Sequence, residues 1–373
     1  MDTTLVKFSN SMKVAVASGA ALLMLTGCAT NEAGTETTTD DAQASSLSGT
    51  LAGAGASSQD AAQQSGWIAG FQTANADVTI NYDPSGSGAG RESFQQGAVA
   101  FAGSDRAFKT DEIEAGPFEA CTTGDIIEIP AYISPIAIIF NVEGVTDLNL
   151  DAETIANIFN GSITNWNDAA IADQNPDATL PDQAIVAVHR SDKSGTTGNF
   201  TDYLGAAAPD AWTAGSVEEW PAEITGGEAA QGTSGVVEAV KGGVGTIGYA
   251  DASKADGLGT VKVKVGEEYV AYSPEAAAAI VDASPLEDGR TAGDLAIELD
   301  RSSTEAGVYP IVLVSYLIGC EQYADAANAE LVKAYFSYIV SAEGQDAAAT
   351  ASGSAPISDT LREKAVAAID SIA

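Results

Sequence analysis

The sequence predicts an α/β fold in two lobes with a ligand cleft between them. Apolar runs with the period of strands alternate along the chain with runs of helical spacing, which is typical of folds with mainly parallel sheets. Residues 47–373 are too many for one ordinary core and suit two domains of usual size. Because such sheets bind ligands at the carboxyl ends of their strands, we expect the functional residues there.

The first 27 residues are expected to be a signal peptide that is not part of the fold. Lys7 and Lys13 precede an apolar run at 14–25, which is shorter than the roughly 20 residues that a membrane-spanning helix needs. The segment LTGC at 25–28 has the form of a bacterial lipobox, which predicts a lipid anchor on the thiol of Cys28. A plain secretory signal with an incidental cysteine is the alternative.

Residues 28–46 are expected to form a flexible tether. They are mostly Thr, Glu, Asp, Ser, Ala and Gly, and without large apolar side chains they cannot bury enough surface to fold. The almost wholly apolar run at 133–142 reads as a buried central strand at the start of a second lobe. We therefore assign residues 47–131 and 256–373 to a first lobe and residues 132–255 to the second.

The elements of the first lobe follow from local patterns. A helix is expected after the Gly- and Ala-rich stretch 47–58, with Ser57 or Ser58 as its N-cap, and another from about Arg91, after the glycine-rich loop 86–90. Strands are expected, from alternating or continuous apolar residues, at 78–82, 99–102 and 309–317.

The second lobe shows the same alternation. Ile155, Ile158 and Phe159 fall at helical spacing, and a second amphipathic helix follows Thr197. Strands are expected at 133–142, 185–188 and 243–250.

The charge balance is strongly acidic, with 16 Lys and Arg against 52 Asp and Glu and a formal net charge of −36. Nucleic acid is excluded as a partner, because its binding depends on clustered basic residues and counterion release. A solvated surface that keeps the protein soluble explains such acidity without any partner.

Three segments share a design that suits anion binding, because in each the chain passes through Ser and Gly into the start of a helix. These are Ser57, Ser87 in the loop 86–90, and Ser194-Gly195-Thr196. Helix N-termini carry partial positive charge and unpaired N–H donors, and glycine lets the backbone approach an anion closely. A serine before a helix is more often only an N-cap, so each segment alone indicates little.

Arg190 strengthens this interpretation. It ends a predicted strand four residues before Ser194 and would place a bidentate cation beside that helix start. An ion pair with Asp192 is the purely structural alternative, and the two are compatible, because Asp192 can orient the guanidinium while a ligand takes its other face.

Asp105, after the strand at 99–102, is the acceptor that distinguishes between anions. Phosphate near neutral pH still carries a proton, whereas sulfate does not. An ionised aspartate accepts a hydrogen bond from phosphate and repels sulfate, so specificity arises from an acceptor as well as from attraction. The plainer interpretation of Asp105 is a loop or N-cap residue.

Five segments in order resemble the phosphate-binding lipoproteins of bacterial phosphate ABC transporters. They are GAGAS at 53–57, NYDPSGSGAG at 81–90, FAGSD at 101–105, IFNGSITNWND at 158–168 and HRSDKSGTTGNF at 189–200. The resemblance implies a type II periplasmic-binding-protein fold, with two lobes joined by a two-strand hinge and closing over a dehydrated phosphate. It also implies a lipid-anchored monomer on the extracytoplasmic face of the cell membrane, which binds phosphate with high affinity, delivers it to a membrane permease and needs no cofactor or metal.

The ligand contacts implied by this resemblance are Ser57, Ser87, Asp105, Arg190, Ser194, Gly195 and Thr196. Two departures from the family pattern are modest. Ser57 stands where some members have Thr, and Gly88 follows Ser87 where many members have a second Ser, so the site would have one hydroxyl fewer.

Cys121 and Cys320 remain once Cys28 is assigned to lipid. In an oxidising compartment a disulfide between them can persist, and their expected place in the same lobe favours it. Two separate buried thiols are the alternative.

Other functions find less support in the sequence. His189 is the only histidine, and Asp192 and Ser194 are too close to it in sequence to form a hydrolase triad by themselves. No His/Asp/Cys cluster has metal-ligand spacing, and the loop 86–90 lacks the Lys-Ser/Thr ending of a Walker A motif. Binding of sulfate, molybdate or another oxyanion and a surface interaction role remain as alternatives.

Overall fold

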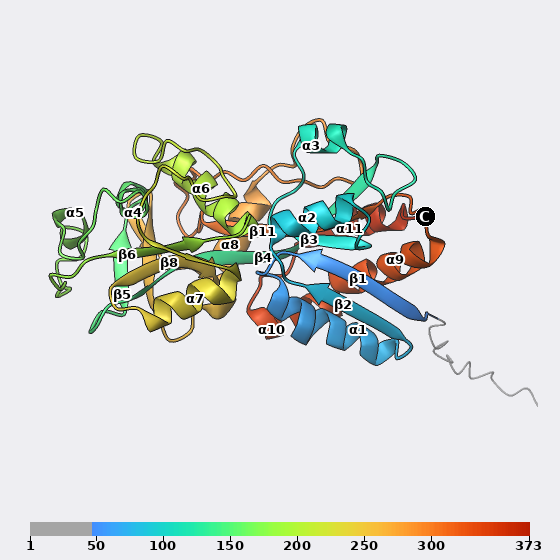
Figure 1. Ribbon diagram of the computed structural model, residues 1–373, viewed down its shortest axis with the longest axis horizontal. Coiled ribbons are helices and arrows are strands. Elements are labelled where there is room, and N and C mark those ends of the chain that lie inside the picture. Colours follow the sequence, from blue (N-terminus) through green and yellow to red (C-terminus); the bar gives the residue numbers. More distant parts are fainter. Residues whose placement is uncertain (1–46) are drawn as a thin grey trace, which may run out of the picture. The chain divides into compact units, whose positions relative to one another are not determined.

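A mixed sheet of eleven strands is the framework of the computed structural model, which describes residues 47–373 (Figure 1). The expected signal peptide, Cys28 and the tether lie outside the described residues. The strands are β1 (Gly49–Gly55), β2 (Val78–Asp83), β3 (Phe101–Ser104), β4 (Ile126–Asn141), β5 (Asp147–Leu150), β6 (Val186–Arg190), β7 (Glu228–Ala230), β8 (Thr246–Asp251), β9 (Gly259–Val265), β10 (Glu268–Val270) and β11 (Val312–Cys320). The main path of the sheet is β2-β1-β3-β11-β4-β8-β6-β7. The predicted α/β fold is confirmed.

The long strand β4 belongs to both ends of this sheet. Its residues 126–135 pair with β11, and its residues 136–141 pair with β8. On one side lie β11 and the parallel strands β1, β2 and β3, which we call lobe I. On the other lie β5 to β10, which we call lobe II. The strand is sixteen residues long and mostly apolar, and fifteen of its residues are buried.

Helices cover both lobes. They are η1 (Ala62–Trp67), α1 (Ile68–Ala74), α2 (Ser87–Gln95), α3 (Thr110–Ala115), α4 (Ala152–Phe159), α5 (Ala169–Ala172), α6 (Gly195–Ala207), α7 (Gly232–Gly242), η2 (Ala252–Lys254), α8 (Pro274–Ala283), α9 (Ala326–Val340), α10 (Ala342–Ser352) and α11 (Asp359–Asp370). The helices α1, α9, α10 and α11 lie with lobe I, and α4 to α7 lie with lobe II (Figure 1). No helix in this part of the chain is long and apolar enough to cross a membrane.

The two strands that follow the predicted boundary between residues 255 and 256 pair with strands of lobe II. β9 pairs with β4 and β5, and β10 pairs with β9, so we group residues 259–270 with lobe II. The segment 284–311, orange in Figure 1, then contacts both lobes. The carbonyl of Gly293 accepts a hydrogen bond from the N–H of Glu128 on β4, and Arg301 donates to Asp202 on α6 at 3.0 Å.

Near the N-terminus of the body, one strand was not predicted and one helix start was misplaced. The Gly- and Ala-rich stretch forms β1, which lies between β2 and β3, because a Cβ at Gly53 would lie only 2.1 Å from the Phe101 ring and only glycine allows this approach. The helix α2 begins at Ser87, four residues before the predicted start at Arg91.

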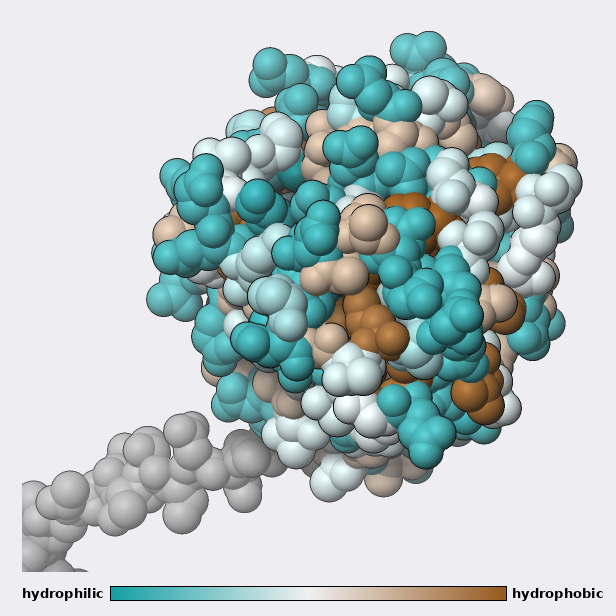
Figure 2. All heavy atoms as spheres, turned by 90° about the vertical axis from the view of Figure 1, so that its left-hand side faces the viewer, coloured by the Kyte–Doolittle hydropathy of each residue, from teal (hydrophilic) through white to brown (hydrophobic). Residues whose placement is uncertain are grey.

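Hydrophilic side chains cover most of the end of lobe II, with apolar atoms visible between them (Figure 2). The interior is aromatic and aliphatic: Phe101, for example, packs edge-on against Tyr335 at 5.7 Å between ring centroids. This distribution agrees with the solvated surface expected from the acidic composition.

Candidate functional site

Asp105 follows the last residue of β3 and is almost completely buried, with 2% of its surface exposed. Its Oδ1 accepts hydrogen bonds from the hydroxyls of Ser58 at 2.5 Å and Ser315 at 2.7 Å, and its Oδ2 accepts one from Thr196 at 3.0 Å. Ser58 and Ser315 lie in lobe I, whereas Thr196 lies on α6 in lobe II. Donors from both lobes therefore meet at one carboxylate.

The surroundings of Asp105 act on its charge in opposite directions. Burial raises the pKa of Asp105 above its ordinary value, while the hydroxyls of Ser58, Ser315 and Thr196 and the charge of Arg190 lower it. Hydrogen bonds donated to a carboxylate stabilise its ionised form. The site thus equips Asp105 to serve as an acceptor in a place from which water is excluded.

Arg190 ends β6 and is also 2% exposed. Its Nε and Nη2 donate to the two oxygens of Asp192 at 2.8 and 2.5 Å, which fixes the plane of the guanidinium. Its Nη1 donates to the Thr196 hydroxyl at 3.4 Å. Burial alone would raise the pKa of Asp192, but Arg190 and the N–H of Gly232 lower it below its ordinary value. One edge of the guanidinium is therefore held by Asp192, and the other faces Thr196.

The segment Ser194-Gly195-Thr196 begins α6 as the sequence suggests. Ser194 is the N-cap, and its hydroxyl accepts a hydrogen bond from the N–H of Thr197 at 3.2 Å. A Cβ at Gly195 would lie 2.6 Å from Ser87 Oγ and 2.7 Å from Asp105 Cβ. The absence of a side chain here is what lets the N-terminus of α6, with its partial positive charge, reach lobe I.

Ser87 is the first residue of α2, and its hydroxyl accepts a hydrogen bond from the N–H of Asp105 at 3.1 Å. The preceding Gly86 has a φ of 104°, and a Cβ there would lie 2.6 Å from Asp192 Oδ2. A side chain at this position would strain the backbone and would also clash with Asp192. The start of α2 is thus fitted closely against the Arg190–Asp192 pair.

Ser57 makes a different contact from the predicted N-cap. It lies in a turn before the helix, and its hydroxyl oxygen is 3.1 Å from Thr233 Oγ1 and accepts a hydrogen bond from the N–H of Thr233 at 3.1 Å. Thr233 is the second residue of α7 in lobe II. Ser57 therefore links lobe I to α7 of lobe II, whereas its neighbour Ser58 contacts Asp105 within lobe I.

Four members of this network are missing from the predicted set: Ser58, Asn199, Thr233 and Ser315. Two of them carried a signal in the sequence. Ser315 is the single serine of an otherwise mostly apolar strand, and Thr233 lies in a Gly-Thr-Ser-Gly segment like those chosen. The side-chain amide of Asn199 donates to the Asp105 carbonyl at 2.6 Å and to the Gly195 carbonyl at 2.9 Å.

His189 is engaged elsewhere. Its ring stacks on Trp220 at 4.6 Å between centroids, and its Nδ1 lies 3.0 Å from the Arg190 carbonyl. Ser194 caps α6, so the side chains of a Ser/His/Asp triad each have other partners. Within residues 47–373, no group of three or more His, Cys, Asp and Glu side chains is placed to hold a metal ion.

The disulfide between Cys121 and Cys320 is present and joins residues 199 apart in sequence. Cys320 is the last residue of β11, which pairs with β3 and with the first part of β4. The bridge therefore lies in lobe I, away from the cluster around Asp105.

Comparisons with known proteins agree with this fold. A model of the PBP superfamily domain matches residues 35–343. The chain is 34% identical over 367 residues to phosphate-binding protein PstS 3 of Mycobacterium tuberculosis, covering 96% of this chain and 97% of that protein.

Two solved structures align at lower identity and show the shared fold. A high-affinity periplasmic phosphate-binding protein (PfluDING) bound with phosphate aligns with a TM-score of 0.69 at 23% identity, covering 86% of this chain and 93% of that one. A putative phosphate ABC transporter substrate-binding protein with bound phosphate from Clostridium perfringens aligns with a TM-score of 0.57 at 22% identity, covering 82% and 98%.

Proposed function

This chain belongs to the PBP superfamily and to its PstS-type phosphate-binding proteins, and on that premise we propose that it binds inorganic phosphate and delivers it to the membrane permease of an ABC transporter. The observation that carries the proposal is the position of Thr196 between Asp105 and Arg190. Its hydroxyl donates to the carboxylate at 3.0 Å and accepts from the guanidinium at 3.4 Å. A cation and an acceptor are thus held within one buried cluster.

This combination suits a tetrahedral oxyanion that still carries a proton. The guanidinium of Arg190, the N-terminus of α6 and the hydroxyls of Ser57, Ser87 and Ser194 supply donors and positive charge. Asp105 supplies the acceptor for the proton of phosphate. Sulfate and molybdate have no proton at neutral pH to offer it, so their oxygen would face a carboxylate at close range.

Closure of the lobes is the second part of the proposed function. Phosphate contacts Asp105 and Ser87 from lobe I and Arg190 and Thr196 from lobe II, and it makes all of these contacts only when the lobes are together. Binding therefore stabilises the closed state. The permease would distinguish the loaded protein from the empty one by this difference in shape.

The N-terminal segment completes the proposal. Signal residues 1–27 are removed, Cys28 carries lipid, and residues 28–46 tether a monomeric body to the extracytoplasmic face of the membrane. By the square-root scaling of flexible linkers, a tether of this length spans roughly 20–25 Å. The body could then reach a permease in the same membrane.

Uptake of radiolabelled phosphate by cells that lack the gene tests this function. High-affinity uptake should be lost on deletion, restored by the wild-type gene and not restored by the Arg190→Ala variant. Normal uptake in the deleted cells would refute delivery to a transporter, and turnover of a phosphomonoester by the purified protein would favour a hydrolase instead.

A further inference from the structure

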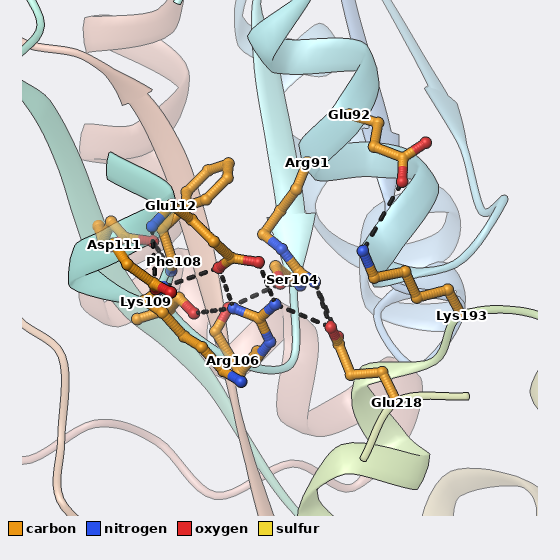
Figure 3. Close-up of polar contacts among 12 residues, drawn as sticks. Arg91, Glu92, Ser104, Arg106, Phe108, Lys109, Asp111, Glu112, Lys193 and Glu218 are labelled. Carbon is orange, nitrogen blue, oxygen red and sulfur yellow. Dashed lines mark hydrogen bonds and ion pairs between the residues drawn. The ribbon is translucent and has the colours of Figure 1, made fainter. Parts of the chain in front are cut away.

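Glu218 in lobe II forms ion pairs with two arginines of lobe I (Figure 3). Its Oε1 and Oε2 accept hydrogen bonds from Nη2 of Arg91 at 2.8 and 2.6 Å, and its Oε2 also accepts one from Nη2 of Arg106 at 2.8 Å. The side chains of Arg91 and Glu218 are only 3% and 11% exposed. We call these three side chains the Glu218 latch.

The acidic half of the latch is fixed to the predicted ligand segment of lobe II. The Glu218 carbonyl accepts a hydrogen bond from the N–H of Ser194 at 3.0 Å. The N–H of the preceding Val217 donates to the hydroxyl of Thr201 on α6 at 2.9 Å. Glu218 therefore moves with the start of α6.

The basic half is fixed to lobe I beside Asp105. Arg91, on α2, donates through Nη1 to the hydroxyl of Ser104 at 2.6 Å, and Ser104 immediately precedes Asp105. Arg106 immediately follows Asp105 and forms a two-point pair with Glu112 at 2.7 and 2.8 Å. Both arginines are held in place within lobe I whether or not Glu218 is present.

The charges explain why the latch favours the closed state. Burial alone would raise the pKa of Glu218, but Arg91 and Arg106 lower it below its ordinary value. If the lobes part, Glu218 loses both partners, and Arg91 loses its only ion pair within residues 47–373. Because the pairs are largely shielded from solvent, they are screened less by salt than pairs on an open surface.

The latch also stands where the site meets the surface. Asp105, Arg106 and Glu218 all line one groove with a volume of about 1260 Å³. The ion pairs of Glu218 connect the two walls of the groove next to Asp105, the predicted acceptor for phosphate. Phosphate that leaves along this side would have to pass the joined walls.

We propose that Glu218 is a positioning residue that holds the lobes closed over bound phosphate and thereby sets the rate of phosphate release. The inference rests on the proposed function, since release has no meaning without phosphate binding. Glu218 acts through lobe closure and does not contact the ligand.

A second ion pair between the lobes serves as a comparison. Lys193 Nζ lies 3.7 Å from Glu92 Oε1, and these side chains are 37% and 60% exposed (Figure 3). Exposed pairs of this kind stabilise little. Removing Glu92 should therefore leave release almost unchanged, although it too removes a carboxylate between the lobes.

The test measures dissociation of radiolabelled phosphate from the purified protein after addition of excess unlabelled phosphate, with the dissociation constant from titration calorimetry. Glu218→Gln should release phosphate about 10- to 100-fold faster, the range for losing a buried charge-assisted hydrogen-bonded pair, with a similar rise in Kd. The matched controls Glu92→Gln and Glu219→Gln, of which the second changes the exposed neighbour of Glu218, should stay within about twofold of wild type.

Two further readouts separate closure from a general structural role. Added salt should speed release from wild type more than from Glu218→Gln, and the Tm without phosphate should hardly change. If Glu218→Gln unfolds, Arg106→Gln, which removes one of the two partners, should show a smaller acceleration. Unchanged release from a variant that binds phosphate would overturn the latch alone, whereas no phosphate binding by wild type would overturn the proposed function and the latch with it.

Discussion

The hydroxyl of Thr196 on lobe II donates a 3.0 Å hydrogen bond to the carboxylate of Asp105 on lobe I. The two residues are 91 positions apart, and both are at most 2% exposed. This contact places the N-terminus of α6 against the carboxyl end of β3. The lobes therefore meet at the residues that we expect to bind phosphate, and closure and ligand binding depend on the same atoms.

Replacing Arg190 by Ala should weaken phosphate binding by about 2–5 kcal/mol, which is at least about 30-fold in Kd. The variant loses the only buried cation of the predicted site and leaves Asp192 without its main partner. Titration calorimetry measures the change. Lys262→Ala removes an exposed cation from β9 and should leave Kd unaltered; equal losses in both variants would mean that net charge, and not the site, is responsible.

Replacing Gly195 by Ala should impair binding by blocking closure. The added Cβ would lie 2.6 Å from Ser87 Oγ and 2.7 Å from Asp105 Cβ, so the lobes could not approach as they do. We expect Kd to rise about 5- to 150-fold, from a misfit of the order of 1–3 kcal/mol. In Gly205→Ala, on the same helix, the nearest atom lies at 3.7 Å, and binding should persist. Tight binding by Gly195→Ala would contradict closure at this contact.

The buried Asp251 should make stability depend on pH. Burial raises the pKa of Asp251 from 3.8 to about 6. The folded state therefore binds the proton more tightly than the unfolded state, and the stability that this contributes, fully present below about pH 4, is lost as pH rises through 6.

Asp251→Asn keeps a neutral side chain at all pH values. Relative to wild type it should gain up to about 3 kcal/mol in free energy of unfolding between pH 4 and pH 7. Urea denaturation at several pH values measures this difference. A difference that does not vary with pH would show that Asp251 is not protonated in the folded protein below pH 6.

Reduction of the Cys121–Cys320 disulfide should lower stability by about 2–5 kcal/mol, because the bridge closes a long loop in the unfolded chain. Thermal denaturation with and without reductant measures the loss, and the double variant Cys121→Ser and Cys320→Ser should match the reduced protein. Two thiols that react with an alkylating agent in the untreated protein would contradict the bridge.

The sequence predicted best those elements whose signals are local. The apolar run ending at Arg190 and the Ser-Gly-Thr segment after it form β6 and α6, with Ser194 as N-cap. Here the strand, the cap and the amphipathic helix each depend on a few adjacent residues. The strand predicted at 99–102 is β3, which begins and ends two residues later.

The errors lie where distant contacts decide. A glycine such as Gly53 does not by itself favour a strand. Its role in β1 is to leave room for the Phe101 ring, which packs where a Cβ would lie. Ser57 looks like an N-cap, but Thr233, 176 positions away, takes its hydroxyl. The grouping of residues 259–265 with lobe II likewise depends on the pairing of β9 with β5, which no local sequence pattern indicates.

Titration calorimetry of the purified protein, freed of copurified ligand, with phosphate and then with sulfate at pH 7 tests the site most directly. We expect tight one-to-one binding of phosphate and no heat with sulfate, and we expect Asp105→Asn to lose this discrimination by admitting sulfate. Sulfate binding by wild type would contradict the role of Asp105, and no response to either anion would contradict the proposed function.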